Sequence, residues 1–235
     1  AEDTEKYYQL FGSFLLEAEW DVLDLTSIPE ASPTIKYIPD FFKKKGFNVQ
    51  ILEEDVVPGI VLPKTWDGFL QSLRKKDRHE LRRKIRRMEE SGQYQLRSAN
   101  LATLDDDMVA LLDLMRTSHI GKQDFLTENR VHFFRAIVKE MAELNYLRLQ
   151  FLEIEGTPLA VVLGFDYAGI RWLYNSGYMV RADSLSAGLV LKALFINDAV
   201  DLGLEYFDFM KGAEAYKYRL GGKDSRLYQI LIDKT

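Results

Sequence analysis

Residues 207–222 read FDFMKGAEAYKYRLGG, and no other stretch of the chain is as distinctive. It begins inside an alternating segment, residues 205–210, in which aromatic side chains recur at every second position as in a strand. A short helix is expected over residues 213–220, and the two glycines that follow it are typical of a helix end. Residues 226–232 (RLYQILI) then have the pattern of a final strand. The C-terminal part therefore predicts a strand, a short helix and another strand in succession.

The elements upstream extend this order back to residue 94. We expect a strand, two helices, a meander of three strands with short turns, and an apolar helix that ends at Gly203. Their ranges are 94–97 for the first strand, about 105–118 and 127–144 for the helices, 147–151, 159–165 and 170–179 for the meander, and 188–202 for the apolar helix. The predicted order is β-α-α-β-β-β-α-β-α-β, which places the chain in the α/β class.

The N-terminal part has its own alternation of helices and strands. Helices are expected at 4–18 and 33–45, and strands at 20–25 and 47–52. Thr65 then has the chemistry of an N-cap for one long helix that ends at Gly92. The apolar stripe of that helix is interrupted around Asp77, where we expect the helix to leave its supporting surface.

Length and composition are those of a globular protein. The 235 residues include 47% hydrophobic and 29% charged side chains and allow one large domain or two small ones. Cysteine is absent, which excludes disulfide bonds, thiolate metal sites and a cysteine nucleophile. No apolar run is long enough to span a membrane and no secretory signal pattern is present, so we expect a cytoplasmic protein. The chain starts at Ala1 rather than at an initiator methionine, so we also expect a fragment of a longer protein.

The charge is unevenly distributed. The total is −5, yet residues 74–87 (RKKDRHELRRKIRR) carry nine basic and two acidic side chains, a local charge of +7. One interpretation is a solvated helix face on which Glu80 pairs with Lys76 and Lys84. The other is a seat for an anionic substrate or for tRNA phosphates. The candidate contacts in that second case are Arg78, Arg82 and Arg83.

Several common sites are excluded. His79, His119 and His132 lie on different predicted helices without metal-ligand spacing, so no metal site is expected. The chain has no G-x-S-x-G motif and no glycine-rich phosphate loop of the P-loop or Rossmann type. Serine-hydrolase, P-loop and dinucleotide-binding functions therefore have no support.

The junction before the apolar helix is a candidate phosphate site. Residues 184–188 read SLSAG, and a helix entered through small residues presents free N–H groups and the positive end of its dipole. Gly188 would allow a diphosphate to approach the backbone closely. The alternative is structural: Ser186 is then an ordinary N-cap and Gly188 has no special role.

The element order and three motifs together resemble the GNAT acyltransferase superfamily, in particular its CelD-like branch, which is related to the Fem peptidyltransferases. The motifs are residues 78–84 (RHELRRK), residues 186–189 (SAGL) and the segment 207–222. The resemblance implies a GNAT-like mixed, mostly antiparallel sheet flanked by helices. Since members of this branch have a preceding GNAT-like half, it also implies that residues 1–64 are part of that half. Residues 65–235 would then hold a linking basic helix and a complete GNAT-like acyltransferase domain.

The same resemblance implies that acyl-CoA binds at this junction. Pantetheine would lie along the strand that precedes it, and the diphosphate would lie on the helix entry with a charged partner. The cofactor-binding residues implied are Ser186, Ala187, Gly188, Leu189, Arg181 and Tyr178. Only Gly188 clearly matches a glycine of the common [QR]-x-x-G-x-[GA] motif. This departure leaves a second donor open, because Fem relatives use aminoacyl-tRNA in place of acetyl-CoA.

Direct acyl transfer needs a base for the acceptor and an acid for the leaving thiolate. By the resemblance, Tyr216 is placed like the acid of many GNAT enzymes; the alternative is a core aromatic residue with a bonded hydroxyl. Asp208 and Glu214 are the nearest carboxylates for a base, and Asp208 has a second interpretation as an acceptor for neighbouring backbone N–H groups. Lys217 is either a substrate contact or the partner of Glu214 in a surface ion pair at i,i+3.

The resemblance therefore implies an acyltransferase that moves an acyl group, acetyl in the first instance, from acyl-CoA to an amine or hydroxyl. The acceptor is expected to be anionic or amine-bearing, such as a cell-envelope or polysaccharide-related molecule. Two alternatives remain: a Fem-type aminoacyltransferase that uses charged tRNA, and a catalytically silent GNAT-like module that docks an anionic partner. No oligomeric state is predicted.

Overall fold

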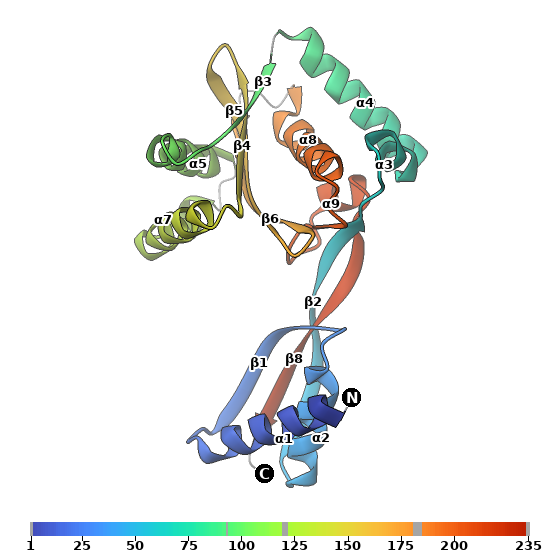
Figure 1. Cartoon of the computed structure of the whole chain (residues 1–235), viewed down its shortest axis with the longest axis vertical. Coiled ribbons are helices and arrows are strands. Elements are labelled where there is room, and N and C mark those ends of the chain that lie inside the picture. The colour runs from blue at the N-terminus through green and yellow to red at the C-terminus, as the bar shows by residue number, and fades with distance from the viewer. Residues whose placement is uncertain (1, 93, 119–121, 181–184, 234–235) are drawn as a thin grey trace. The chain divides into compact units, whose positions relative to one another are not determined.

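The computed structural model describes residues 2–92, 94–118, 122–180 and 185–233 (Figure 1). The chain divides into two compact units, each assembled from segments far apart in the sequence. The first unit consists of Ala1–Pro58, Lys211–Ala213 and Lys223–Thr235, and the second of Gly59–Met210 and Glu214–Gly222. The C-terminal strand thus belongs to the unit formed by the N-terminal segment. The expected division at residue 64, with a partial first half before it, stays a prediction.

The secondary structure follows the expected alternation. The helices are α1 (Glu2–Glu17), α2 (Thr34–Lys44), α3 (Trp66–Ser72), α4 (Lys75–Glu90), α5 (Leu104–Ser118), α6 (Lys122–Phe125), α7 (Glu128–Glu143), α8 (Ala187–Asp201) and α9 (Ala215–Arg219). The strands are β1 (Val22–Pro29), β2 (Asn48–Val61), β3 (Tyr94–Ser98), β4 (Leu147–Ile154), β5 (Thr157–Tyr167), β6 (Ile170–Tyr178), β7 (Tyr206–Asp208) and β8 (Lys223–Asp233). Within the described ranges, no helix combines the length and the apolar character that crossing a membrane requires.

The first unit packs helices α1 and α2 against strands β1 and β8, which pair antiparallel. Its core is formed by Tyr8 of α1, Ile38 and Phe42 of α2, and Ile230 and Ile232 of β8. The alternating pattern at the C-terminus accounts for this arrangement, because Ile230 and Ile232 point to the same face of β8.

The second unit is built on a mixed sheet. Along it the strands follow the order β2-β7-β6-β5-β4-β3, and only the end of β2 belongs to this unit. Strands β3 to β6 pair antiparallel in sequence order, which confirms the predicted meander. Strand β7 pairs antiparallel with β2 and parallel with β6. The predicted mixed, mostly antiparallel sheet flanked by helices is therefore confirmed.

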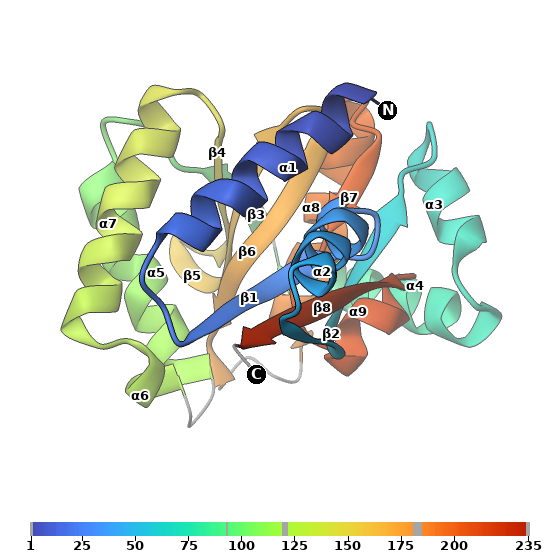
Figure 2. The same ribbon diagram turned by 90° about the horizontal axis from the view of Figure 1, so that it is seen from below.

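Helices cover both faces of this sheet (Figures 1 and 2). On one face α5 and α7 pack against β4, β5 and β6; on the other, α8 packs against the same strands and is flanked by α3 and α4. Helix α5 lies so close to β6 that a Cβ atom on Gly177 would be 2.5 Å from the backbone carbonyl carbon of Leu114. Glycine at this position therefore permits the contact.

Helix α8 holds the candidate site in place because it is buried along its length. Val190, Leu191, Ala193, Phe195 and Ile196 are fully buried, and they come from all sides of the helix. A helix that is apolar all round is anchored on every side. Its first turn is therefore fixed against the sheet, close to the end of β6.

The basic helix differs from the prediction. Instead of one helix over 65–92, the chain is extended at Leu73 and Arg74, with ψ angles of 149° and 143°, which separates α3 from α4. At the break the Leu73 side chain is buried in the hydrophobic core, next to Gly221, and the break lies just before the interruption expected at Asp77. Thr65 does cap the first of the two helices, since its Oγ1 accepts a hydrogen bond from the Gly68 N–H at 3.1 Å.

Candidate active site

A pocket of about 280 Å³, which we call the loop pocket, lies at the start of α8. Five of the six residues predicted to bind a cofactor line it, together with the predicted acid. The lining residues are Tyr178, Ser186, Ala187, Gly188, Leu189 and Tyr216, with three cations that were not predicted, Lys84, Lys192 and Arg219. The sixth predicted residue, Arg181, lies outside the described residues.

Ser186 precedes α8 but does not cap it with its side chain. Its backbone is left-handed (φ 55°, ψ 37°), a conformation that non-glycine residues rarely adopt. Its hydroxyl instead accepts a hydrogen bond from Nζ of Lys84 at 2.5 Å. The interpretation of Ser186 as an ordinary N-cap is therefore wrong, and the residue ties the start of α8 to α4.

Gly188 lies against the ring of Tyr178. A Cβ atom on Gly188 would be 3.1 Å from Cδ1 of Tyr178, tighter than an ordinary contact. The small residue thus allows the first turn of α8 to approach the last residue of β6. The carbonyl oxygen of Gly188 also accepts a hydrogen bond from Nζ of Lys192 at 3.3 Å.

Strand β6 has different partners along its two edges. On one side it pairs with β5 along its length. On the other, β7 pairs only with Ile170–Trp172, because β7 ends at Asp208. The parallel pairing therefore stops well before Tyr178 and the loop pocket.

Tyr216 enters the loop pocket from α9. Burial raises the pKa of its phenol above the ordinary value of about 10. Nζ of Lys192 lies 4.8 Å from the centre of the Tyr216 ring, a cation–π contact. The phenol is consequently neutral near pH 7 and can donate a hydrogen bond.

Asp208 is buried, and it lines neither the loop pocket nor the larger pocket beside it that is described below. Burial raises the pKa of its carboxyl group, and Oδ1 accepts a hydrogen bond from the Met210 N–H at 2.6 Å. The neighbouring Phe207 and Phe209 are in the hydrophobic core, as expected for alternation along a strand. These contacts agree with the interpretation of Asp208 as an acceptor for backbone N–H groups; its role as a base stays a prediction.

Lys217 and Glu214 form the expected i,i+3 ion pair, but it is not a surface pair. Nζ of Lys217 lies 2.8 Å from Oε2 of Glu214 and donates to the carbonyl oxygen of Met210, also at 2.8 Å. The Lys217 side chain is 2% exposed, whereas that of Glu214 is 57% exposed. Neither residue lines the two pockets described here, so their predicted roles in catalysis and substrate binding stay untested.

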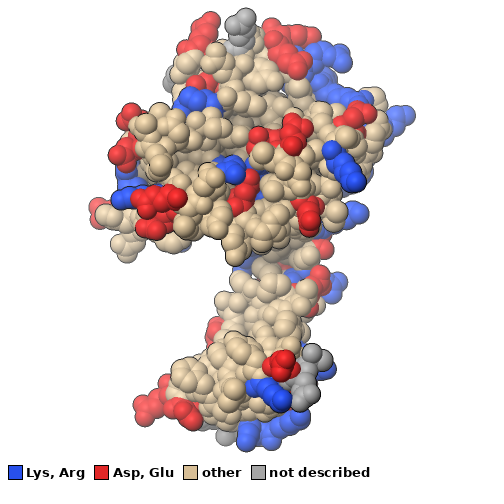
Figure 3. Space-filling model, viewed as in Figure 1, with Lys and Arg blue, Asp and Glu red and all other residues tan. Residues whose placement is uncertain are grey.

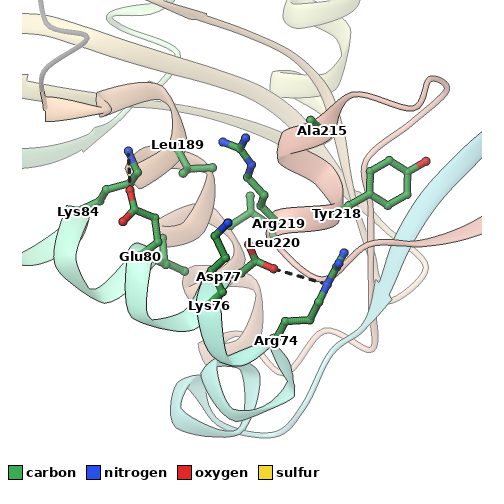
Figure 4. Close-up of a pocket in the computed structure, with 11 residues that line it drawn as sticks. Arg74, Lys76, Asp77, Glu80, Lys84, Leu189, Ala215, Tyr218, Arg219 and Leu220 are labelled. Atoms are coloured by element: carbon green, nitrogen blue, oxygen red, sulfur yellow. Dashed lines mark ion pairs between the residues drawn. The ribbon is translucent and has the colours of Figure 1, made fainter.

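A larger pocket of about 690 Å³, which we call the α4 pocket, adjoins the loop pocket (Figure 4). Lys84, Leu189 and Arg219 line both pockets, which makes the two contiguous. The other lining residues come from α4 and the residue before it, and from α9 and the residue after it: Arg74, Lys76, Asp77, Glu80, Leu81, Ala215, Tyr218 and Leu220. Figure 3 shows basic side chains, interspersed with acidic ones, over the region of the second unit where α3 and α4 run in Figure 1.

The three arginines predicted to contact substrate line neither of these pockets. They make other contacts: Arg78 donates to the carbonyl oxygen of Gln71 at 3.2 Å, Arg82 lies 3.4 Å from the carboxylate of Asp67, and Arg83 lies 2.8 Å from that of Glu80. Such contacts agree with the solvated-face interpretation, and a substrate role for these arginines stays a prediction.

Glu80 has a different set of partners from the one expected. Lys84 pairs with it at 3.4 Å, as predicted. Its second partner is Arg83 rather than Lys76, through two hydrogen bonds of 3.0 and 2.8 Å. The hydrogen bonds from Arg83 lower the pKa of the Glu80 carboxyl group to about 2.

Comparison with known protein families assigns this chain to one of them. The family model described as the acetyltransferase (GNAT) domain matches residues 75–218. The chain belongs to the GNAT family. The matched range runs from α4 into α9 and contains every lining residue of the loop pocket except Arg219. No curated protein sequence matches the chain.

Solved structures share the fold of this GNAT protein at low sequence identity. FemX superposes with a TM-score of 0.68 at 10% identity, over 97% of this chain and 76% of FemX. The C-terminal domain of a putative lysylphosphatidylglycerol synthetase from Agrobacterium fabrum gives 0.63 at 12% identity, over 98% and 73%. L-PGS from Bacillus licheniformis gives 0.61 at 10% identity, over 94% and 70%. These likenesses concern the fold alone.

Four cations that line the pockets of the GNAT domain were not among the predicted site residues: Lys76, Lys84, Lys192 and Arg219. A signal existed for two of them, because Lys76, Glu80 and Lys84 recur every four residues and so share one face of α4. Nothing in the local pattern distinguishes the face of a basic helix that meets α8 from the face that meets water. That distinction depends on which residues of α8 and α9 lie opposite.

Proposed function

We propose that this chain transfers an acyl group, acetyl in the first instance, from acyl-CoA to an amine or hydroxyl of an acceptor. The observation that carries the proposal is the loop pocket, where the helix-entry residues and Tyr216 lie together. In this scheme the first turn of α8, together with the cation Lys84, seats the donor diphosphate. The acyl-pantetheine arm would extend from there along the edge of β6 that β7 does not cover.

The reaction is a direct transfer. The acceptor nitrogen or oxygen attacks the thioester carbonyl carbon, the new C–N or C–O bond forms, and the C–S bond breaks. We propose that the Tyr216 phenol donates its proton to the departing thiolate and recovers one from solvent. The acceptor proton passes to a base, for which Asp208 and Glu214 remain the proposed candidates.

The acceptor remains proposed by class only. The exposed basic side chains of α4 favour an anionic acceptor; an amine-bearing one, or a cell-envelope or polysaccharide-related one, is proposed from the sequence resemblance alone. Calorimetric titration with acetyl-CoA and CoA tests the donor, and thiol release in the presence of amine and hydroxyl acceptors tests the transfer. We expect heat of binding for both nucleotides; no heat from either would contradict the proposal.

The second candidate is a Fem-type aminoacyltransferase that takes its acyl group from charged tRNA. The fold shared with FemX and the basic helix α4 favour it. The ion pairs of Arg82 and Arg83 count against it, because each phosphate contact would compete with a carboxylate. Gel-shift titration with tRNA at two salt concentrations separates the candidates, since phosphate-based binding weakens steeply with salt.

A catalytically silent module would bind a partner and show no thiol release with any acceptor.

A further inference from the structure

The α4 pocket contains more positive than negative charge. Four cations line it, Arg74, Lys76, Lys84 and Arg219, against two carboxylates. Both carboxylates have partners: Asp77 lies 3.5 Å from Arg74, and Glu80 pairs with Lys84 and Arg83. Arg83 is not a lining residue, so it satisfies Glu80 without using a pocket cation.

Two of the four cations that line the pocket do not pair with its carboxylates. Neither Lys76 nor Arg219 forms an ion pair with any residue in the described part of the chain. Figure 4 shows that they extend into the pocket from different elements, Lys76 from α4 and Arg219 from α9. Two unpaired cations on separate elements around one cavity are suited to hold an anion with several oxygen atoms, such as a phosphate.

The position of the pocket indicates which part of a ligand it receives. It is contiguous with the loop pocket through Lys84, Leu189 and Arg219, so one extended ligand could occupy both. Tyr216, the proposed proton donor, lines the loop pocket and not the α4 pocket. The group in the α4 pocket therefore belongs to the end of the donor that does not react.

The rest of the lining fits a nucleotide. Leu81, Leu189, Ala215 and Leu220 offer apolar surface, and Tyr218 adds an aromatic ring. Apolar and aromatic side chains with a few charged groups can accommodate a base and ribose together with their phosphate.

We infer that Lys76 and Arg219 bind a phosphate group at the nucleotide end of the acyl donor, which for acyl-CoA is the 3′-phosphate. This inference rests on the proposed function, and it gives the α4 pocket a role in choosing between donors. A donor that lacks the phosphate loses both contacts but keeps its diphosphate and its thioester.

The test compares acetyl-CoA with 3′-dephospho-acetyl-CoA by calorimetry on the full chain and on the variants Lys76→Gln and Arg219→Gln. We expect the wild type to bind acetyl-CoA at least about tenfold more tightly than the dephospho form. Each variant is expected to reduce this preference about fivefold, chiefly by weakening the binding of acetyl-CoA. Lys75→Gln is the matched control, because it removes the same charge from an exposed residue of α4 that does not line the pocket.

The outcomes separate the inference from the proposed function. If the wild type binds both donors equally, or if the two variants weaken both donors alike, the inference is wrong while acyl-CoA remains the donor. If Lys75→Gln lowers the preference as much as Lys76→Gln, the effect is one of general charge and the inference is also wrong. If neither donor binds the wild type, the proposed function fails and the inference fails with it.

Discussion

Nζ of Lys84 donates a hydrogen bond to the hydroxyl of Ser186, which joins the basic helix α4 to the residue before α8. The two residues are 102 positions apart in the sequence. Lys84 also pairs with Glu80, and its side chain is 20% exposed, so it is held between a carboxylate and the helix entry. This contact places a cation at the point where a donor diphosphate would meet the first turn of α8.

Replacing Lys84 tests that role. We expect Lys84→Met to weaken the binding of acetyl-CoA about tenfold, because the variant loses a charge-assisted contact to the diphosphate and the tie to Ser186. Calorimetry measures the affinity. Ser186→Ala is the companion variant: it removes only the tie, so it should weaken binding less. Equal affinities for wild type and Lys84→Met would show that Lys84 does not contact the donor.

Replacing Tyr216 tests the proposed proton donor. Tyr216→Phe should lower the rate of acyl transfer by about 100-fold or more while changing the donor affinity little, because only the proton transfer is lost. Burial raises the pKa of this phenol, so it remains protonated through pH 6 to 10, and the wild-type rate should not fall from loss of this acid in that range. Thiol-release kinetics across that range measure both effects.

Tyr167→Phe is the control for this variant, since Tyr167 is 60% exposed and lines neither described pocket. An unchanged rate in Tyr216→Phe would return Tyr216 to the role of a core aromatic residue.

Asp208 offers a pH-dependent test of stability. Burial raises its pKa in the folded state above the ordinary value of 3.8, so the folded protein holds this proton more tightly than the unfolded chain. The contribution of Asp208 to stability is therefore greatest below pH 3.8 and declines as the pH rises through the raised pKa. Asp208→Asn keeps an acceptor for the Met210 N–H but does not titrate, so its stability should lack this decline.

Urea unfolding of the wild type and Asp208→Asn over a pH series measures the difference. The transfer rate of the same variant decides the chemical role: a rate near that of the wild type contradicts Asp208 as the base, and a large loss without unfolding supports it.

The buried ion pair gives a prediction about stability alone. Lys217→Met removes the donor to the Met210 carbonyl oxygen, and we expect it to lower the free energy of unfolding by about 1–3 kcal/mol. Glu214→Gln should cost less than Lys217→Met, because the glutamine side chain keeps an oxygen acceptor for the buried Nζ of Lys217 and the contact of Lys217 with the Met210 carbonyl oxygen remains. Chemical denaturation of both variants measures the pair. Equal losses would mean that the Met210 contact adds nothing beyond the ion pair.

Much of the fold was predictable because its signals are local. The alternation at 205–210, the glycine after α8 and the turns of the meander each act within a few residues, and the structure has the corresponding elements. The break between α3 and α4 was not predicted, because Leu73 there packs against Gly221 and other core residues far along the chain. For the same reason, the sequence did not indicate that β8 pairs with β1 in the first unit.

The candidate site also has parts that the sequence predicts and parts that depend on contacts between distant segments. The sequence by itself determined the GNAT family, the helix entry at residues 186–189 and Tyr216, because those residue types are recognisable wherever the helix lies. Only the tertiary structure decided which cations of the basic helix face the pockets. Glu80 has Lys76, Arg83 and Lys84 all within helical reach, and such pairs differ by no more than a few tenths of a kcal/mol. The folded structure shows which contacts form: Arg83 pairs with Glu80, Lys84 reaches Ser186 at the start of α8, and Lys76 lines the α4 pocket.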